Sequence, residues 1–244
     1  MSGQPLAALA SGVLSAAHCG GATGRGVRVA VIDSGVHAGH PHVGAVEGGV
    51  SFAADGARGV DAVDRLGHGT AVAAAIREKA PEAVLIPVKV FDRELRATAD
   101  ALVAAIDWAV AAQVQVINLS LGTANAAHEA RLLTALERAA AAGVCLVAAG
   151  EQDGTRWLPG SLAPAVGVML DWTCPRDQAD ARVEEQGGVR RVTFRASGYP
   201  RPIPGVPPER NLKGVSFAVA NVTGLLCLHL SRGPVAVTSI PSEP

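Results

Sequence analysis

The sequence predicts a single α/β domain with a doubly wound, mostly parallel sheet and helices on both faces. Three observations support this prediction. Short β-branched runs, typical of strands buried on both faces, alternate with longer segments of helical periodicity. The chain has 244 residues, a length that suits one core. Finally, 49% of the residues are hydrophobic but only 3% are aromatic, so small aliphatic side chains must build that core.

The first part of the chain supplies the expected β-α-β order. An Ala-rich segment at residues 6–17 predicts a helix, and the glycines that follow it predict a turn. The β-branched run at residues 27–32 predicts a buried strand that ends at Asp33. After a polar, Gly-rich stretch we expect a helix over residues 69–79 and a strand over residues 83–90.

The same alternation continues in the middle of the chain. A helix over residues 98–112 precedes a strand over 114–119, and a helix over 126–142 precedes a strand over 144–148. Gly143 suits the end of the second of these helices. The order predicts parallel strands with helical crossovers.

The last third is less regular. Residues 151–212 mix Pro, Gly and charged residues, so we expect loops and short strands there, for example at 165–170 and 189–194. Residues 216–230 are apolar almost all round and predict a helix buried through the middle of the domain. We expect one domain spanning residues 1–244, with a frayed tail after residue 233.

Charge and targeting signals argue against several classes of partner. The formal charge is -1, so neither nucleic acid nor an anionic membrane is an expected partner. No Lys or Arg precedes the apolar N-terminal stretch, so we expect no signal peptide and a cytoplasmic location. We also expect no prodomain, because the first catalytic motif begins at Val29 and leaves no room before it for a long folding domain. The cysteines are scattered and form no C-x-x-C pair, which predicts free thiols rather than a zinc site or disulfides. They are Cys19, Cys145, Cys174 and Cys227.

Three polar residues lie at the edges of apolar elements: Asp33, His68 and Ser216. In a doubly wound sheet, strand carboxyl ends and helix N-termini converge at one crevice. Serine becomes a nucleophile when a base removes its proton, and the base works best when a carboxylate orients it. The sequence therefore offers Ser216 as nucleophile, His68 as base and Asp33 as the orienting carboxylate.

Three segments resemble a known family in its order of motifs. The segment Val29-Ala30-Val31-Ile32-Asp33-Ser34-Gly35-Val36 resembles the aspartate segment of the subtilase family of serine peptidases. Gly67-His68-Gly69-Thr70 resembles its histidine segment, and Gly214-Val215-Ser216-Phe217-Ala218 resembles its serine segment. The resemblance implies a subtilisin-like fold, hydrolysis of peptide bonds by these three residues, and a peptide or protein substrate.

Two further stretches fit the same resemblance. Asn118-Leu119-Ser120-Leu121-Gly122 resembles the strand that pairs with the bound peptide. Val147-Ala148-Ala149-Gly150 resembles the wall of the pocket for the residue before the cleaved bond, and its small side chains leave room for a bulky apolar one. The implied substrate-binding residues are Ser120, Leu121, Gly122, Ala148, Ala149 and Gly150.

One position departs from the family pattern. Where the family has an Asn that donates to the oxyanion, this chain has Glu151, whose charge would repel the developing negative charge. Two arrangements would still supply a hydrogen-bond donor to the oxyanion. The amide of Gln152 could take the place of the Asn, or Glu151 could be protonated, as in the related sedolisins. We favour Gln152.

Two functions of different classes follow. The first is an active, narrow-specificity intracellular endopeptidase that processes a peptide or partner protein. The second is a degenerate peptidase that binds a peptide without cleaving it, which the change at Glu151 motivates. We expect no cofactor, although family members often bind calcium through backbone oxygens that sequence does not reveal. The cluster His37, His40 and His42 predicts a solvated loop rather than a metal site.

Overall fold

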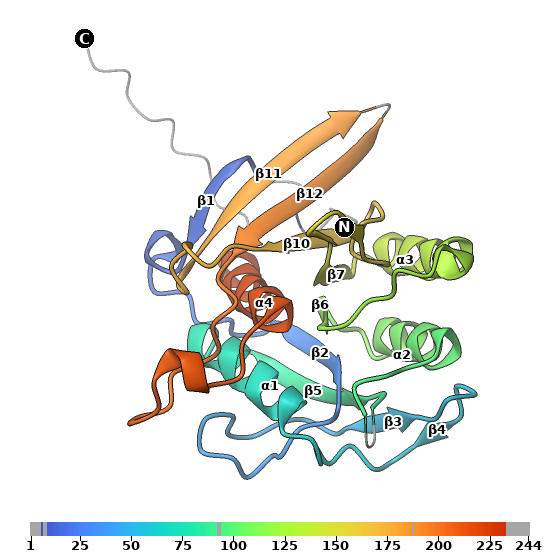
Figure 1. Cartoon of the computed structure of the whole chain (residues 1–244), viewed down its shortest axis with the longest axis horizontal. Coiled ribbons are helices and arrows are strands. Elements are labelled where there is room, and N and C mark those ends of the chain that lie inside the picture. The colour runs from blue at the N-terminus through green and yellow to red at the C-terminus, as the bar shows by residue number, and fades with distance from the viewer. Residues whose placement is uncertain (1–5, 7–8, 92–93, 187, 233–244) are drawn as a thin grey trace.

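A ten-stranded sheet forms the centre of the computed structural model, which describes residues 6, 9–91, 94–186 and 188–232 (Figure 1). The strand order is β1-β11-β12-β10-β7-β6-β2-β5-β3-β4. The strands are β1 (Gly12–Ser15), β2 (Arg28–Asp33), β3 (Val50–Phe52), β4 (Arg58–Gly59), β5 (Val84–Lys89), β6 (Val116–Leu119), β7 (Cys145–Ala149), β10 (Val166–Leu170), β11 (Gln178–Gln186) and β12 (Val189–Ala196). A small separate hairpin consists of β8 (Glu151–Gln152) and β9 (Thr155–Arg156).

The centre of this sheet is parallel. Each neighbouring pair from β12 through β10, β7, β6, β2 and β5 to β3 runs in the same direction. Antiparallel pairs occur toward the two edges, where β1 and β12 each pair with β11 and where β4 pairs with β3. The predicted doubly wound, mostly parallel sheet is thus confirmed.

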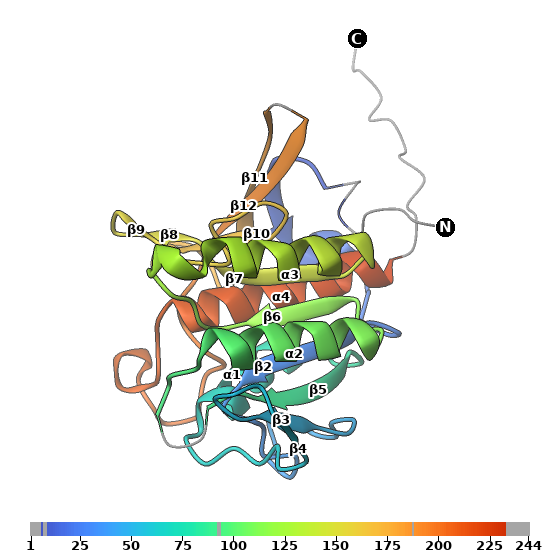
Figure 2. The same ribbon diagram turned by 90° about the vertical axis from the view of Figure 1, so that its right-hand side faces the viewer.

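Helices cover both faces of the parallel part (Figure 2). The helices α1 (His68–Lys79) and α4 (Val215–Ser231) pack on one face, whereas α2 (Ala99–Ala111) and α3 (Glu129–Ala141) pack on the other. Short 3-10 helices are present at Ala17–Cys19, Ala126–His128 and Pro208–Arg210.

The strand β2 shows why both faces need a cover. Its successive side chains point in opposite directions, so Val29 and Val31 join the core beneath α1 and α4, whereas Ala30 and Ile32 join the core beneath α2 and α3. All four side chains are fully buried. Each fully buried Val or Ile contributes roughly 1.5–3 kcal/mol through the hydrophobic effect. The strand is therefore held firmly, and Asp33 at its carboxyl end is held with it.

The predicted central helix is confirmed as α4. Its residues from Phe217 to Leu228 are all buried, because it lies between the sheet and α1. Close approach to α1 depends on Gly224, where a Cβ atom would lie 2.9 Å from Cβ of Lys79. A central helix held in this way places Ser216, its second residue, at a defined point.

One predicted element is wrong. Instead of the expected helix at residues 6–17, the chain forms β1, which pairs with β11 at the edge of the sheet. Tertiary pairing overrides the helical preference of alanine here, and Gly12 adopts a φ of 135°, which a helix would not accommodate. The partner strand β11 was itself not anticipated, although its alternating small and charged residues are typical of a strand. The expected frayed tail after residue 233 lies outside the described residues.

Among the described residues, no helix combines the length and the hydropathy that crossing a membrane requires.

Candidate active site

The structure brings His68 against Asp33. Asp33 ends β2 and is fully buried, and its Oδ1 lies 2.7 Å from Nδ1 of His68, the first residue of α1. The same oxygen accepts the backbone N–H of Ser34 at 2.7 Å, whereas Oδ2 is buried with no hydrogen-bond partner among the described residues. The pair fixes the imidazole with its other nitrogen, Nε2, directed away from the carboxylate.

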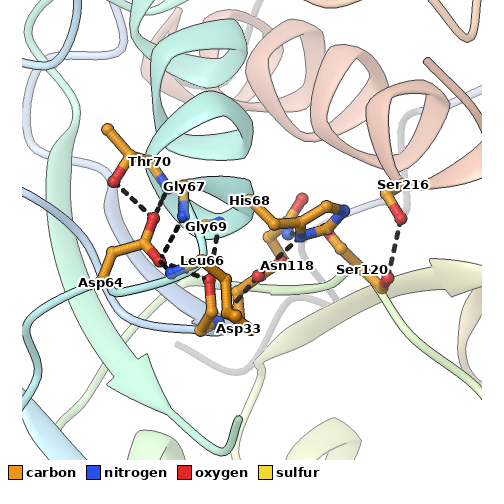
Figure 3. A network of polar contacts seen from close by, with 11 residues as sticks. Asp33, Asp64, Leu66, Gly67, His68, Gly69, Thr70, Asn118, Ser120 and Ser216 are labelled. Atoms are coloured by element: carbon orange, nitrogen blue, oxygen red, sulfur yellow. Dashed lines mark hydrogen bonds and ion pairs between the residues drawn. The ribbon is translucent and has the colours of Figure 1, made fainter. Parts of the chain in front are cut away.

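Ser216 lies on the other side of the imidazole (Figure 3). It is the second residue of α4, and its hydroxyl donates to the backbone carbonyl of Ser120 at 3.0 Å. The next residue, Phe217, stacks obliquely on His68 with ring centroids 5.8 Å apart. The structure therefore gathers all three predicted catalytic residues at the meeting point of β2, α1 and α4.

The pKa of His68 is raised above its ordinary value of 6.5 by its surroundings. Burial by itself lowers this pKa, since it penalises the imidazolium. The hydrogen bond to Asp33, the charge of Asp33 and the charge of Asp64 act in the opposite direction and prevail. The site thus stabilises the imidazolium, the form that His68 takes once it has accepted a proton.

Asp64 is a functional residue that the sequence reasoning missed. Its Oδ1 accepts the backbone N–H groups of Leu66 and Gly67, each at 2.9 Å, and the hydroxyl of Ser34 at 2.8 Å. Its Oδ2 accepts from the backbone N–H of Thr70 at 2.9 Å and from its hydroxyl at 2.6 Å. An Asp four residues before the predicted catalytic His, at a helix start, was the available signal.

These hydrogen bonds fix the first turn of α1 to the end of β2. Ser34, the neighbour of Asp33, donates to Asp64 and accepts from the backbone N–H of Gly69 at 2.9 Å. The negative charge of Asp64 also lies at the positive end of the helix dipole. Burial raises the pKa of Asp64, but its hydrogen bonds, that of the Thr70 hydroxyl first, lower it overall. His68 is held from both sides as a result.

The predicted substrate-binding stretches lie side by side. Residues 120–122 follow β6, whereas Ala148 and Ala149 end β7, the neighbouring parallel strand, and Gly150 comes directly after it. Asn118 holds Ser120 in place, because its amide nitrogen donates to the hydroxyl of Ser120 at 2.7 Å. The amide oxygen of Asn118 in turn accepts from the hydroxyl of Thr223 in α4 at 3.0 Å. These buried hydrogen bonds couple the predicted peptide-binding stretch to the helix that carries Ser216.

The structure does not bring Gln152 to the site in the expected way. Its amide nitrogen donates to Asp153 at 3.1 Å, and its amide oxygen accepts the backbone N–H of Leu170 at 3.1 Å. The side chain is therefore turned toward β10 and its own hairpin rather than toward Ser216. Glu151 is exposed at the same hairpin. The backbone N–H of Ser216 itself, in the first turn of α4, is a donor beside the nucleophile, whereas those of Phe217 and Ala218 donate to the carbonyl of Gly214.

The described residues contain no group of three or more His, Cys, Asp or Glu side chains arranged to hold a metal ion. In the His-rich loop, His40 and His42 pack edge to face with ring centroids 5.2 Å apart. The backbone carbonyl of His42 accepts from Arg201 at 3.0 Å. A guanidinium beside this loop disfavours a bound cation.

Comparison with known proteins agrees with these features. The model of the subtilase family matches residues 24–186. The chain is 30% identical over 235 residues to subtilisin E of Bacillus subtilis (strain 168), covering 92% of this chain and 58% of that protein. It is 29% identical over 235 residues to subtilisin of Bacillus pumilus, covering 92% of this chain and 81% of that protein.

Solved structures show the same fold. A cold-adapted subtilisin-like serine proteinase matches with a TM-score of 0.65 and 22% identity, over 87% of this chain and 78% of that one. A lanthipeptide protease matches with a TM-score of 0.62 and 22% identity, over 84% and 73%. The chain nevertheless spans only 58% of the length of subtilisin E.

Proposed function

Since this chain belongs to the subtilase family, we propose that it is a serine endopeptidase that hydrolyses peptide bonds through Asp33, His68 and Ser216, acting as a single domain. The observation that carries this proposal is the 2.7 Å contact between Nδ1 of His68 and the buried carboxylate of Asp33, with Ser216 across the ring. That arrangement supplies a nucleophile, a base and an orienting group in the required order.

The reaction follows from the positions of these groups. The hydroxyl of Ser216 leaves the carbonyl of Ser120, gives its proton to Nε2 of His68 and attacks the peptide carbonyl. Asp33 stabilises the imidazolium that results. His68 then passes the proton to the departing amine, and water hydrolyses the acyl-enzyme by the same route. The N-terminus of α4 favours the negative charge on the tetrahedral intermediate.

Substrate would bind as an additional strand along residues 120–122. In this mode main-chain hydrogen bonds give affinity, and pockets for side chains give selectivity. The contact between Ser216 and Ser120 supports it, because a peptide paired with this stretch passes directly over the nucleophile.

We propose further that the enzyme is an intracellular processing protease of narrow specificity. All four cysteines are free, which suits a reducing compartment. Burial raises the pKa of Cys145 to about 12, so this thiol is unreactive and serves packing. The exposed Glu151 takes the position where the family resemblance expects an oxyanion donor, which supports slow turnover and suits an enzyme that spares other proteins of the cell.

One observation favours the second candidate, a peptide-binding protein without activity. The amide of Gln152 is occupied by Asp153 and Leu170, so it does not replace the missing oxyanion donor in this conformation. Removing one such donor costs on the order of 10²- to 10³-fold in turnover. Peptide binding that persists without any turnover would identify this second function.

A fluorophosphonate probe tests the proposal directly. In such probes an activated serine attacks phosphorus and displaces fluoride, so we expect a phosphonate ester at Ser216, located by mass spectrometry of the tryptic peptides. Labelling should disappear in Ser216→Ala and in His68→Ala, whereas the matched control Ser51→Ala, in β3, should be labelled like the wild type. A folded wild-type protein that resists the probe would contradict the endopeptidase proposal.

A further inference from the structure

Trp157 stands at the predicted pocket for the substrate residue before the cleaved bond. We propose that it restricts cleavage to bonds that follow a small residue, namely glycine, alanine or serine. This inference rests on the proposed peptidase function and names the substrate class of the same site. It reverses the expectation, drawn from the small side chains of Ala148 to Gly150, that a bulky apolar side chain fits.

The segment that carries Trp157 connects the two walls of this pocket. On one side, the backbone of Leu158 exchanges two hydrogen bonds with that of Thr123, each 2.9 Å long. On the other side, the backbone N–H of Trp157 donates to the carbonyl of Gly150 at 3.0 Å. Residues 157–158 therefore span the distance from the end of the peptide-binding stretch to the end of β7 and close the space between them.

The side chain of Trp157 lies against the first of these walls. A Cβ atom placed on Gly122 would lie 3.3 Å from Cβ and 3.7 Å from Cε3 of the tryptophan. The ring thus occupies volume beside Gly122, where any larger residue would crowd it. It is partly buried and packs against the apolar core beneath α1 and α4. Since tryptophan has the largest side chain, little depth remains for a substrate side chain.

The peptide-binding stretch links the nucleophile to this ring, because Ser216 contacts one end of it and the ring lies beside the other. Ser216 contacts the carbonyl of Ser120, and Gly122 follows two residues later. Two residues of extended chain span roughly 7 Å, since a strand rises about 3.3 Å per residue. A peptide paired with this stretch would accordingly place the side chain before its cleaved bond over Gly122 and the indole.

Trp157 is anchored too firmly for its backbone to withdraw. Its N–H is bound to Gly150, and its carbonyl accepts the backbone N–H of Ser161 at 2.8 Å. The turn that follows packs directly against the wall formed by the end of β7, because a Cβ atom on Gly160 would lie 2.1 Å from the carbonyl oxygen of Ala149. Enlarging the pocket by moving this loop would break several of these contacts, so the shallow shape is built into the fold.

Hydrolysis of matched substrates tests the inference. We would compare tetrapeptide p-nitroanilides that are identical except for Ala, Leu or Phe before the cleaved bond. The wild type should prefer Ala to Phe by at least about 100-fold in kcat/KM, the scale by which a filled pocket rejects added carbon atoms. Trp157→Ala should lower this ratio by at least about 10-fold, chiefly by raising the rate on Phe. Trp108→Ala in α2, on the opposite face of the sheet, is the matched control and should leave the ratio unchanged.

Two outcomes would overturn the inference: a wild type that cleaves after Phe as readily as after Ala, or a folded Trp157→Ala with an unaltered preference. Trp157→Leu serves as the second variant if the alanine variant does not fold. Peptidyl diphenyl phosphonates ending in the Ala or Phe analogue report the same preference through the rate of Ser216 labelling, even where turnover is slow. The fluorophosphonate probe carries no peptide side chain, so it tests the peptidase function separately. If it labels Ser216 but the enzyme shows no preference among the peptides, the inference alone is refuted. If the probe does not label Ser216 in the folded protein, the peptidase function and this inference are both refuted.

Discussion

Nδ1 of His68 lies 2.7 Å from Oδ1 of Asp33, and the carboxylate at the other end of this contact is fully buried. A buried charge is costly unless it is paired, and Oδ2 of Asp33 has no hydrogen-bond partner among the described residues. The imidazolium of His68 offsets that cost. The same contact that orients the base therefore also shifts the pH at which it works.

Peptidase activity should rise with pH through a midpoint above 6.5. His68 accepts the proton of Ser216 only when its imidazole is neutral, and its pKa is raised. The measurement is kcat/KM across neutral pH. Asp64→Asn removes one of the charges that raise this pKa, so the midpoint should move down. A midpoint below 6.5 in the wild type would contradict this account.

Stability should follow the opposite trend over the same range. Because the folded pKa of His68 lies above its unfolded value, protonation of His68 stabilises the fold fully below the unfolded pKa. This contribution is lost as the pH rises through the folded pKa. Urea denaturation of wild type and His68→Ala on both sides of that range checks the sign, since the difference between them should shrink at higher pH.

Removal of Asp64 should destabilise the start of α1. Asp64→Ala leaves two hydroxyls and three backbone N–H groups without their acceptor, at a cost of about 1–3 kcal/mol in the free energy of unfolding. The pKa of Asp64 is lowered, so its contribution is present above its unfolded pKa and disappears as the pH falls through the folded pKa.

A matched aspartate controls for the loss of charge. Asp55 is exposed, and within the described part of the chain its carboxylate accepts one hydrogen bond, from the backbone N–H of Ala57 at 2.9 Å. Asp55→Ala should change the free energy of unfolding by less than about 1 kcal/mol. Equal effects of the two substitutions in urea denaturation would show that the network at Asp64 contributes no special stability.

Gly69→Ala should separate the catalytic pair. A Cβ atom on Gly69 would lie 2.2 Å from the carbonyl oxygen of Gly35 and 3.1 Å from Cβ of Asp33, so α1 must move away from β2. Overpacking of this kind costs about 1–3 kcal/mol, and misplacing a catalytic group by about 1 Å costs on the order of 100-fold in rate. Gly39→Ala is the control, because a Cβ atom there meets its nearest neighbour at 3.4 Å. Thermal unfolding and kcat measured together check both effects, and an active, stable Gly69→Ala would refute them.

Glu151→Asn should raise turnover. The substitution removes an exposed carboxylate at the start of β8, two residues after β7, and restores an amide where the resemblance places the oxyanion donor. We expect kcat to rise by about 10²- to 10³-fold, the usual effect of one such donor, with little change in KM. Glu137→Asn, an exposed glutamate on α3, removes the same charge elsewhere and should have no effect. Unchanged turnover would favour the peptide-binding function instead.

Local pattern accounts for most of the fold. The strands β2, β5, β6 and β7 and the helices α1 to α4 were predictable, because continuous β-branched runs and helical periodicity are properties of short segments. The edge strand β1 was not, because its conformation depends on pairing with β11, a partner more than 160 residues away in the register Gly12 to Ala181. Pairing over such a distance leaves no trace in local periodicity.

By itself, the sequence determined the order of motifs, the family they resemble and the three residues Asp33, His68 and Ser216, since each motif is local. Only the tertiary structure decided how those motifs are held and what the site admits. The hydrogen bond from Ser34 to Asp64, the engagement of Gln152 with Leu170, and the placement of Trp157 between two walls all join segments distant along the chain. Such contacts are settled when strands and loops pack, because their energies depend on distances that spacing along the chain does not encode.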